Sequence, residues 1–226
     1  MVSSKHPVPS LKFEREAWKA GAHWVAGVDE VGVGPLAGAV AAACVALPPG
    51  RRFKWYRWVN DSKVLPERVR DELAVEIMAA VPWAIGWASP TEIDRINIYQ
   101  ARKLCMLRAF GALAVQPDHI ISDALPLPLP NVRAIIDGDA LSIAVGAASI
   151  VAKVARDAYM VEMCGLYPGY NFRQNKGYPT PEHKRLLVEH GPCPIHWKAA
   201  ILVRPAGKSC CSAPRRRSHR IMRRPA

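Results

Sequence analysis

The chain has 226 residues, of which 50% are hydrophobic, so it is long enough to bury a substantial core as one domain. No apolar run reaches the roughly 20 residues that a membrane-spanning helix needs, so we expect no membrane partner. The net charge is +12, but nine basic and no acidic residues lie from His190 onwards, which leaves +3 for the rest. The basic charge therefore does not by itself make the globular part a nucleic-acid-binding protein.

The six cysteines are scattered through apolar segments and form no Cys-x-x-Cys pair. With no leader-like stretch at the N-terminus, this predicts a reduced, cytoplasmic protein with mostly buried thiols. Composition divides the chain into a polar lead-in with one short helix (1–20), a globular domain (21–204) and a basic, disordered tail (205–226).

Hydrophobic periodicity predicts strands that alternate with helices, although not strictly. Strands are expected at 24–29, 39–47, 81–88, 120–121 and 132–136, the last one buried, and helices at 11–20, from 67 onwards, 90–115, 142–164 and 181–190. Residues 51–59 are expected to form an edge strand or loop, and residues 167–180 a loop. The connection between the first two strands is short enough for a hairpin, which predicts an α/β fold with a mixed central sheet flanked by helices.

Four acidic residues end or closely follow predicted apolar strands: Asp29, Glu30, Asp123 and Asp139. The ends of strands in α/β folds are where functional sites assemble. Carboxylates gathered in one place repel each other and favour a cation, and hard oxygen ligands select Mg²⁺ or Mn²⁺. Any one of these acids alone is better explained as a helix cap or a solvated turn. Four in succession favour a metal site, and a pair of ions there would suit an in-line phosphoryl displacement.

A glycine-rich loop, Gly32-Val33-Gly34, follows the first two acids directly. Glycines allow backbone N–H groups to approach a ligand closely. A dinucleotide-binding loop is excluded by spacing, because the third glycine of Gly-x-Gly-x-x-Gly would fall one residue before Gly38, and the acids precede the loop.

A series of motifs in one order gives these residues a family context. They are Gly27-Val28-Asp29-Glu30-Val31-Gly32-Val33-Gly34-Pro35-Leu36-Ala37-Gly38, Asp61-Ser62-Lys63, Glu92-Ile93-Asp94 with Asn97-Ile98, Asp123, Gly138-Asp139-Ala140, residues 147–157, Tyr167-Pro168-Gly169-Tyr170, Lys176-Gly177-Tyr178-Pro179-Thr180 and Gly191-Pro192-Cys193-Pro194-Ile195-His196. This ordered set resembles bacterial ribonuclease HII, the type 2 ribonuclease H, over about residues 25–196.

The resemblance implies a ribonuclease H-like fold with a small C-terminal helical region. It also implies a metal-dependent endoribonuclease that uses two Mn²⁺ or Mg²⁺ ions, held by Asp29, Glu30, Asp123 and Asp139. Its implied substrates are RNA–DNA hybrids and ribonucleotides embedded in duplex DNA, cut to 3′-hydroxyl and 5′-phosphate ends during DNA replication and repair. The family's tyrosine, which packs on the sugar after the RNA–DNA junction, matches Tyr178. We expect a monomer.

Further residues are candidates for substrate binding. The amides of Gly32, Val33 and Gly34 could reach a 2′-hydroxyl, the group that distinguishes RNA from DNA. Lys63, Lys153 and Lys176 are candidates for phosphate contacts, although each is about equally well explained as a solvated charge. Ser62 and Ser149 are candidates too, with capping or packing as the alternative. His183 and His196 are better explained as structural histidines.

The chain departs from the family's usual pattern at several positions. Val33 stands where arginine is usual, and Ala124 where glycine is usual after the acid. Leu141, Asn175 and Trp197 replace residues that are usually basic. Because several of these changes remove positive charge, we expect an active enzyme that binds its substrate more weakly. The basic tail is expected to restore part of the lost affinity.

Two alternative functions stay open on the sequence alone. One is a catalytically weak or silent relative that binds nucleic acid, which would bind without metal-dependent cleavage. The other is a different metal-dependent nuclease on the same fold, which would cut substrates that contain no ribonucleotide.

Overall fold

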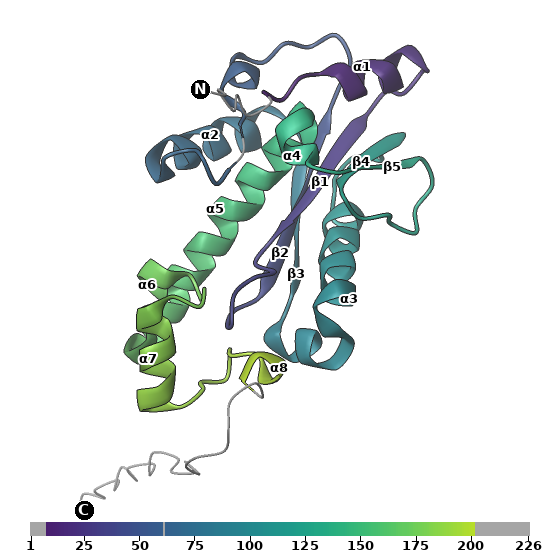
Figure 1. Ribbon diagram of the computed structural model, residues 1–226. Helices are drawn as coiled ribbons and strands as arrows, with labels where there is room; N and C mark the ends of the chain where they lie inside the picture. The colour runs from purple at the N-terminus through teal and green to yellow at the C-terminus, as the bar shows by residue number, and fades with distance from the viewer. Residues whose placement is uncertain (1–7, 61, 202–226) are drawn as a thin grey trace, which may run out of the picture.

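The computed structural model describes residues 8–60 and 62–201, with Ala200 and Ile201 described for their backbone only. Asp61 and the tail predicted at 205–226 lie outside the described residues. The strands are β1 (Val25–Val31), β2 (Val40–Leu47), β3 (Trp83–Ala88), β4 (His119–Asp123) and β5 (Val132–Ile135) (Figure 1). The helices are α1 (Lys12–Lys19), η1 (Lys54–Trp58), α2 (Glu67–Ala80), α3 (Pro90–Gly111), α4 (Gly138–Leu141), α5 (Ile143–Leu166), η2 (Pro168–Tyr170), α6 (Phe172–Asn175), α7 (Pro181–His190) and α8 (Lys198–Ile201).

The five strands form one sheet in the order β3-β2-β1-β4-β5. β1 pairs antiparallel with β2 as the predicted hairpin, and β2 pairs antiparallel with β3. On the other side, β1 pairs parallel with β4, and β4 with β5. The mixed sheet expected from the short first connection is therefore confirmed, with β1 at its centre.

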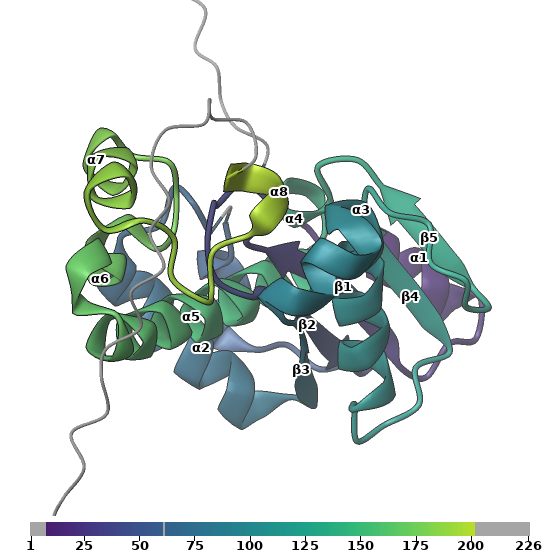
Figure 2. The same ribbon diagram turned by 90° about the horizontal axis from the view of Figure 1, so that it is seen from below.

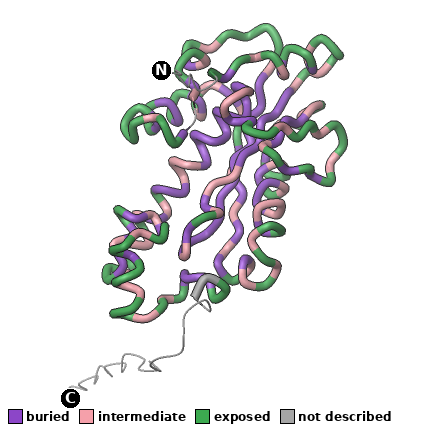
Figure 3. The backbone as a smooth tube through the Cα atoms, viewed as in Figure 1, coloured by how far each residue is buried: buried purple, intermediate pink, exposed green. Residues whose placement is uncertain are grey.

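Helices cover both faces of the sheet, with α3 on one side and α5 with α2 on the other (Figures 1 and 2). Strand β2 is buried along its whole length (Figure 3). Its side chains alternate between the two layers. Ala42, Cys44 and Ala46 join the core beneath α3, whereas Ala43, Val45 and Leu47 join the core beneath α5 and α2. This period of two is the one that a central strand requires.

A glycine lets α5 lie directly against β1. A Cβ at Gly27 would overlap the backbone of Ala144 and Val145, so no larger residue fits without separating the helix from the sheet. The buried carboxylate of Glu14 then holds the start of α5, accepting hydrogen bonds from Ser142 Oγ at 2.6 Å and from the N–H of Ala144 at 2.8 Å. The position of α5 matters because it carries Ser149 and Lys153.

Three local predictions were wrong. Residues 51–59 contain the 3₁₀ helix η1, not a strand, with the buried Trp55 packed edge-on against Tyr56 at 4.6 Å between ring centroids. The segment 167–180 contains η2 and α6, so it is not simply a loop. Strand β5 exists but is not buried: it lies at the sheet edge, and Arg133 and Ala134 are exposed.

A capping box stands at the start of α3. Glu92 N–H donates to Ser89 Oγ at 3.2 Å, and Ser89 N–H donates back to Glu92 Oε2 at 2.8 Å. The helix then kinks at Asn97, whose φ is 66°, and Asn97 Oδ1 accepts the N–H of Gln100. The second part of α3, beyond this kink, carries Arg102.

The end of α5 and the region after it form a separate small core, in agreement with the C-terminal helical region that the family resemblance implies. Met160, Tyr170, Phe172 and Ile195 are buried together there, with Ala37 from the glycine-rich segment. Within the described residues, no helix is both long and apolar enough to span a membrane.

Candidate active site

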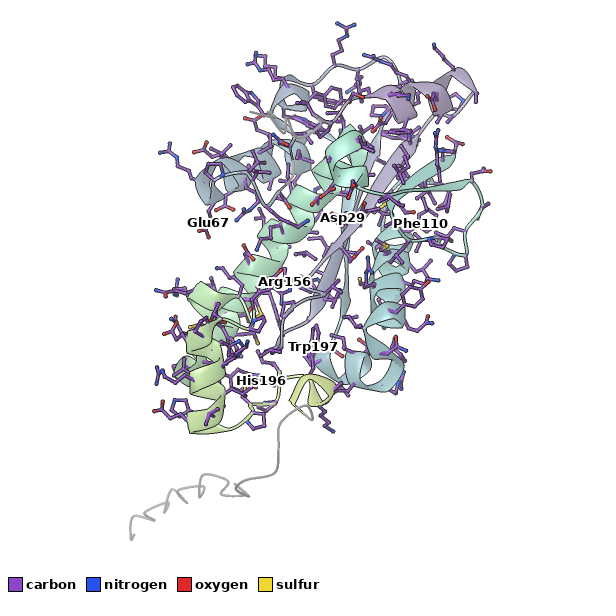
Figure 4. The ribbon with its side chains drawn as sticks, in the orientation of Figure 1. Asp29, Glu67, Phe110, Arg156, His196 and Trp197 are labelled. Atoms are coloured by element: carbon purple, nitrogen blue, oxygen red, sulfur yellow. The ribbon has the colours of Figure 1, made fainter. Side chains whose placement is uncertain are left out.

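A pocket of about 280 Å³ opens where β1 ends. Its lining consists of Asp29, Glu30, Val31, Gly32, Val33, Gly34, Ser62, Lys63, Asp123, Asp139, Ser149, Lys153 and Tyr178. Every site residue predicted from the sequence is therefore present in this lining except Lys176. Figure 4 shows Asp29 beside α4 and the first turns of α5.

Asp29 lies on the α5 side of the site and is 5% exposed. Burial raises its pKa well above the ordinary value, repulsion from Glu30 and Asp123 adds to this, and a hydrogen bond from Ser149 opposes it. Ser149 also shares a 2.9 Å hydrogen bond with the buried Ser62. The two serines thus support Asp29 from the helix and from the segment before α2.

Glu30 is the next residue along β1, so its side chain points to the other face, towards α3. There Arg102 Nε donates to Glu30 Oε1 at 2.6 Å, and Arg102 Nη2 lies 2.5 Å from the same oxygen. Glu30 Oε2 is buried and has no hydrogen-bond partner. Burial raises the pKa of Glu30, and the attraction of Arg102 opposes that shift.

The other two acids come from the parallel half of the sheet. Asp123 ends β4, and its Oδ1 accepts the N–H of Gly138 at 2.7 Å. Asp139 follows in α4, with Lys63 Nζ 3.7 Å from its Oδ2. Burial raises the pKa of Asp123, the Gly138 hydrogen bond opposes this, and repulsion from Asp139 adds to it.

The donor set fits a hard divalent cation. Neither histidine nor cysteine is present among the described residues that line the pocket, and its four carboxylates all supply oxygen. Burial is the largest cause of the raised pKa at Asp29, Glu30 and Asp123, and repulsion from a neighbouring carboxylate adds to it at each. Across residues 8–60 and 62–201, no three acidic, histidine or cysteine side chains are already arranged to hold one ion. Two of the four carboxylates are in ion pairs: Glu30 with Arg102 and Asp139 with Lys63.

The side chain of Arg156 packs against the glycine-rich loop at Gly32 and is fully buried. Its guanidinium donates to the carbonyls of Ala39 and Lys176 at 3.0 Å each and of Ala37 at 3.3 Å (Figure 4). Gly32 has φ +96°, and a Cβ there would strike the Arg156 side chain. Arg156 therefore ties the residues that follow the loop to the segment that carries Tyr178.

Tyr178 faces the loop across the pocket. A Cβ built at Gly34 would lie 3.7 Å from Tyr178 Cε1, which is van der Waals contact. Asn175 shapes the turn before this tyrosine by accepting the N–H of Gly177 at 2.8 Å and donating to Tyr170 O at 2.6 Å. Trp197 donates from Nε1 to Gly38 O at 2.8 Å. Asn175 and Trp197, two departures from the usual family pattern, therefore have structural roles here.

The three candidate lysines differ in their surroundings. Lys153 lines the pocket with its ammonium fixed on Asp157 at 2.6 Å, and burial lowers its pKa. Lys63 is the most accessible, with a side chain that is 78% exposed. Lys176 is absent from the lining, and its carbonyl is bound by Arg156.

Sequence reasoning missed Arg102, Arg156 and Asp157. Arg102 and Arg156 contact partners far away in sequence, and no local pattern marks such pairs. Asp157 also contacts the distant Arg70, but its shortest contact is with Lys153 four residues before it, a helical spacing that could have marked it. The resemblance covered residues 147–157 only as a motif and assigned no role to Arg156.

The model of the ribonuclease HII family matches residues 26–206, which is most of the chain. The chain belongs to the ribonuclease HII family. Membership makes it an enzyme of the metal-dependent ribonuclease class, as the sequence predicts.

Curated relatives agree with the ribonuclease HII assignment. The chain is 48% identical over 200 residues to ribonuclease HII of Myxococcus xanthus (strain DK1622). The matched stretch covers 87% of this chain and 67% of the relative. Identity is 47% over 188 residues to the Moorella thermoacetica enzyme, covering 81% of this chain and 89% of that protein. The chain spans only 62% of the relative from Anaeromyxobacter sp. (strain Fw109-5).

Solved structures carry the ribonuclease HII fold as well. Ribonuclease H2 from Pyrococcus horikoshii OT3 matches with a TM-score of 0.66 and 28% identity, over 79% of this chain and 96% of that one. The enzyme in a PCNA:RNase HII complex from Archaeoglobus fulgidus matches with a TM-score of 0.67 at 24% identity, over 80% and 95% of the two chains. At 24% identity, the similarity to the Archaeoglobus fulgidus enzyme supports only the ribonuclease H-like fold.

Proposed function

We propose that this chain is an endoribonuclease that cuts RNA in RNA–DNA hybrids and at ribonucleotides embedded in duplex DNA. The products would be 3′-hydroxyl and 5′-phosphate ends. One observation carries the proposal: Asp29, Glu30, Asp123 and Asp139 share a pocket with a glycine-rich loop and a tyrosine, in a chain of the ribonuclease HII family. We further propose a cytoplasmic monomer organised as residues 1–20, 21–204 and 205–226.

The four carboxylates are the proposed ligands of two Mg²⁺ or Mn²⁺ ions. Such ions, when bound, activate a water molecule and stabilise the leaving 3′-oxygen. Asp29 and Glu30 approach the pocket from β1, Asp123 from the end of the neighbouring strand β4, and Asp139 from α4. Serine support at Asp29 and the Gly138 hydrogen bond at Asp123 fix two of these acids before any ligand arrives.

Substrate selection is assigned to the loop and the tyrosine. The backbone of Gly32, Val33 and Gly34 lines the pocket, and N–H groups there are suited to a ribose 2′-hydroxyl. The ring of Tyr178 opposes Gly34 and is suited to packing on the next deoxyribose. Lys63 and Lys153 are proposed to contact phosphates, which position the duplex without sequence preference. Lys176 remains a proposed phosphate contact from outside the pocket lining.

The test is cleavage of a duplex with one embedded ribonucleotide, compared with a long hybrid and an all-DNA duplex of the same sequence, in Mg²⁺ and in Mn²⁺. Asp139→Asn is expected to lose about a hundredfold or more in rate, because a lost ligand is worth several kcal/mol of transition-state stabilisation. Asp137→Asn is the matched control. It makes the same change two residues away, at an exposed position whose φ of 56° asparagine tolerates.

Three outcomes would contradict the proposal. Full activity in Asp139→Asn would refute the assignment of the four acids. Binding without cleavage in either metal would favour the silent relative. Cutting of the all-DNA duplex would favour a different nuclease on this fold.

A further inference from the structure

Arg102 contacts Glu30 from the side of the sheet away from the pocket. It projects from α3 and is absent from the pocket lining, so it does not face the proposed substrate. Its side chain is 23% exposed, whereas that of Glu30 is 5% exposed. The ion pair is therefore partly shielded from water, and it acts on the site only through Glu30.

Both donors of Arg102 converge on one oxygen of Glu30. Nε lies 2.6 Å and Nη2 2.5 Å from Oε1, so both contacts with Arg102 are made by this one oxygen. The other oxygen, Oε2, is buried with no partner. A buried carboxylate oxygen with no hydrogen bond is costly, so this arrangement points to a missing ligand at Oε2.

The ion pair at Asp139 differs from the one at Glu30. Lys63 lies 3.7 Å from Asp139 with a side chain that is 78% exposed, so solvent screens this pair more than the Arg102–Glu30 pair. Arg102 is instead held at the second part of α3, next to the buried Ala101 and Cys105. A divalent ion at Glu30 would therefore meet a fixed positive charge on the far side of its ligand.

We propose that Arg102 is a positioning residue that presents Glu30 to the metal through Oε2 alone, and that its charge weakens divalent-ion binding at the same time. This inference rests on the proposed function of the four carboxylates. It predicts two effects of opposite sign when the guanidinium is removed: tighter metal binding, and slower cleavage at saturating metal because Glu30 is no longer oriented. Loss of packing alone would not tighten metal binding.

The experiment is titration calorimetry of the metal-free full-length chain with Mn²⁺, without substrate. Arg102→Met is expected to lower the Mn²⁺ dissociation constant about tenfold, the order of effect for removing one charge near a bound cation in solvent-screened surroundings. Arg102→Lys keeps the charge and is expected to stay near wild type in affinity. Cleavage of the embedded-ribonucleotide duplex at saturating Mn²⁺ is expected to fall in Arg102→Met.

Two controls make the result specific. Arg108→Gln removes a cation from the same helix that pairs with Glu92 and not with the site, so Mn²⁺ affinity is expected to stay unchanged. In a Glu30→Gln background, Arg102→Met is expected to change Mn²⁺ affinity by a different amount than in wild type, because the cycle isolates the part of the effect that passes through Glu30. A urea unfolding curve for each variant identifies any that fails to fold.

An unchanged or weaker Mn²⁺ affinity in folded Arg102→Met would overturn the inference, as would an effect of the same size in Glu30→Gln. Wild-type protein that binds Mn²⁺ but cuts no ribonucleotide-containing substrate would overturn the proposed function while leaving the role of Arg102 standing. Absence of Mn²⁺ binding by the wild-type chain would overturn both.

Discussion

Replacing the buried Arg156 by methionine tests the support beneath the glycine-rich loop. The guanidinium is fully buried and makes three hydrogen bonds to carbonyls of two separate segments. A hydrogen bond to a charged group contributes about 1.5–3 kcal/mol, and burying the cation itself costs several kcal/mol, so the net loss of unfolding free energy is expected to be about 3 kcal/mol. Methionine fills a similar volume, so the effect isolates the lost donors.

The assay is urea unfolding followed by tryptophan fluorescence, where this loss corresponds to a shift of about 1 M in the midpoint. Arg156→Lys is expected to be nearly as unstable, because an ammonium cannot present a planar fork to three carbonyls. Arg173→Met removes the same charge from an exposed site and serves as the control. A wild-type midpoint for Arg156→Met would refute the reasoning.

Three further predictions concern stability and substrate binding. Burial, and then repulsion from His183, lowers the pKa of His196 to about 4, so the unfolded chain binds more protons between pH 6.5 and 4 and stability falls as the pH drops through that window. The loss reaches about 3 kcal/mol at the acid end, and urea midpoints measured against pH should show a flatter profile in His196→Gln. Ala124 has φ +51°, so Ala124→Gly is expected to raise the unfolding free energy by about 0.5–1 kcal/mol in the same urea experiment. The control Ala112→Gly, at an ordinary φ of −92°, is expected to lower it. Deleting residues 205–226 is expected to weaken duplex binding and flatten its salt dependence without changing the saturated cleavage rate; unchanged affinity and salt slope in a fluorescence titration would show that the tail does not compensate for Val33.

Strands and helices with strong periodicity could be predicted from the sequence. The run in β2 is apolar at every position, and the Ser89–Glu92 capping box marks the start of α3. The burial predicted for residues 132–136 was wrong because an apolar run does not tell whether a strand lies at the centre or at the edge of a sheet. The prediction for residues 51–59 was wrong because aromatic residues are typical of strands, whereas here their rings pack on one another in the 3₁₀ helix η1.

The site itself was predictable where its residues lie in contiguous motifs. Asp29, Glu30 and the glycine-rich loop are adjacent in sequence, and the pocket contains them together. Arg102 could not be predicted, because its contact with Glu30 depends on how α3 packs against the sheet. Lys176 was placed in the site by its motif, yet its side chain is absent from the pocket lining.

The adjacency of Asp29 and Glu30 on a central strand has a consequence for the dynamics of the molecule. Consecutive strand residues face opposite sides, so one acid is supported by α5 and the other by α3. An ion shared by the two would link both helical layers, and local opening of either layer would release it. Divalent metal should therefore slow amide hydrogen exchange in α3 and α5 together, although these helices belong to different cores.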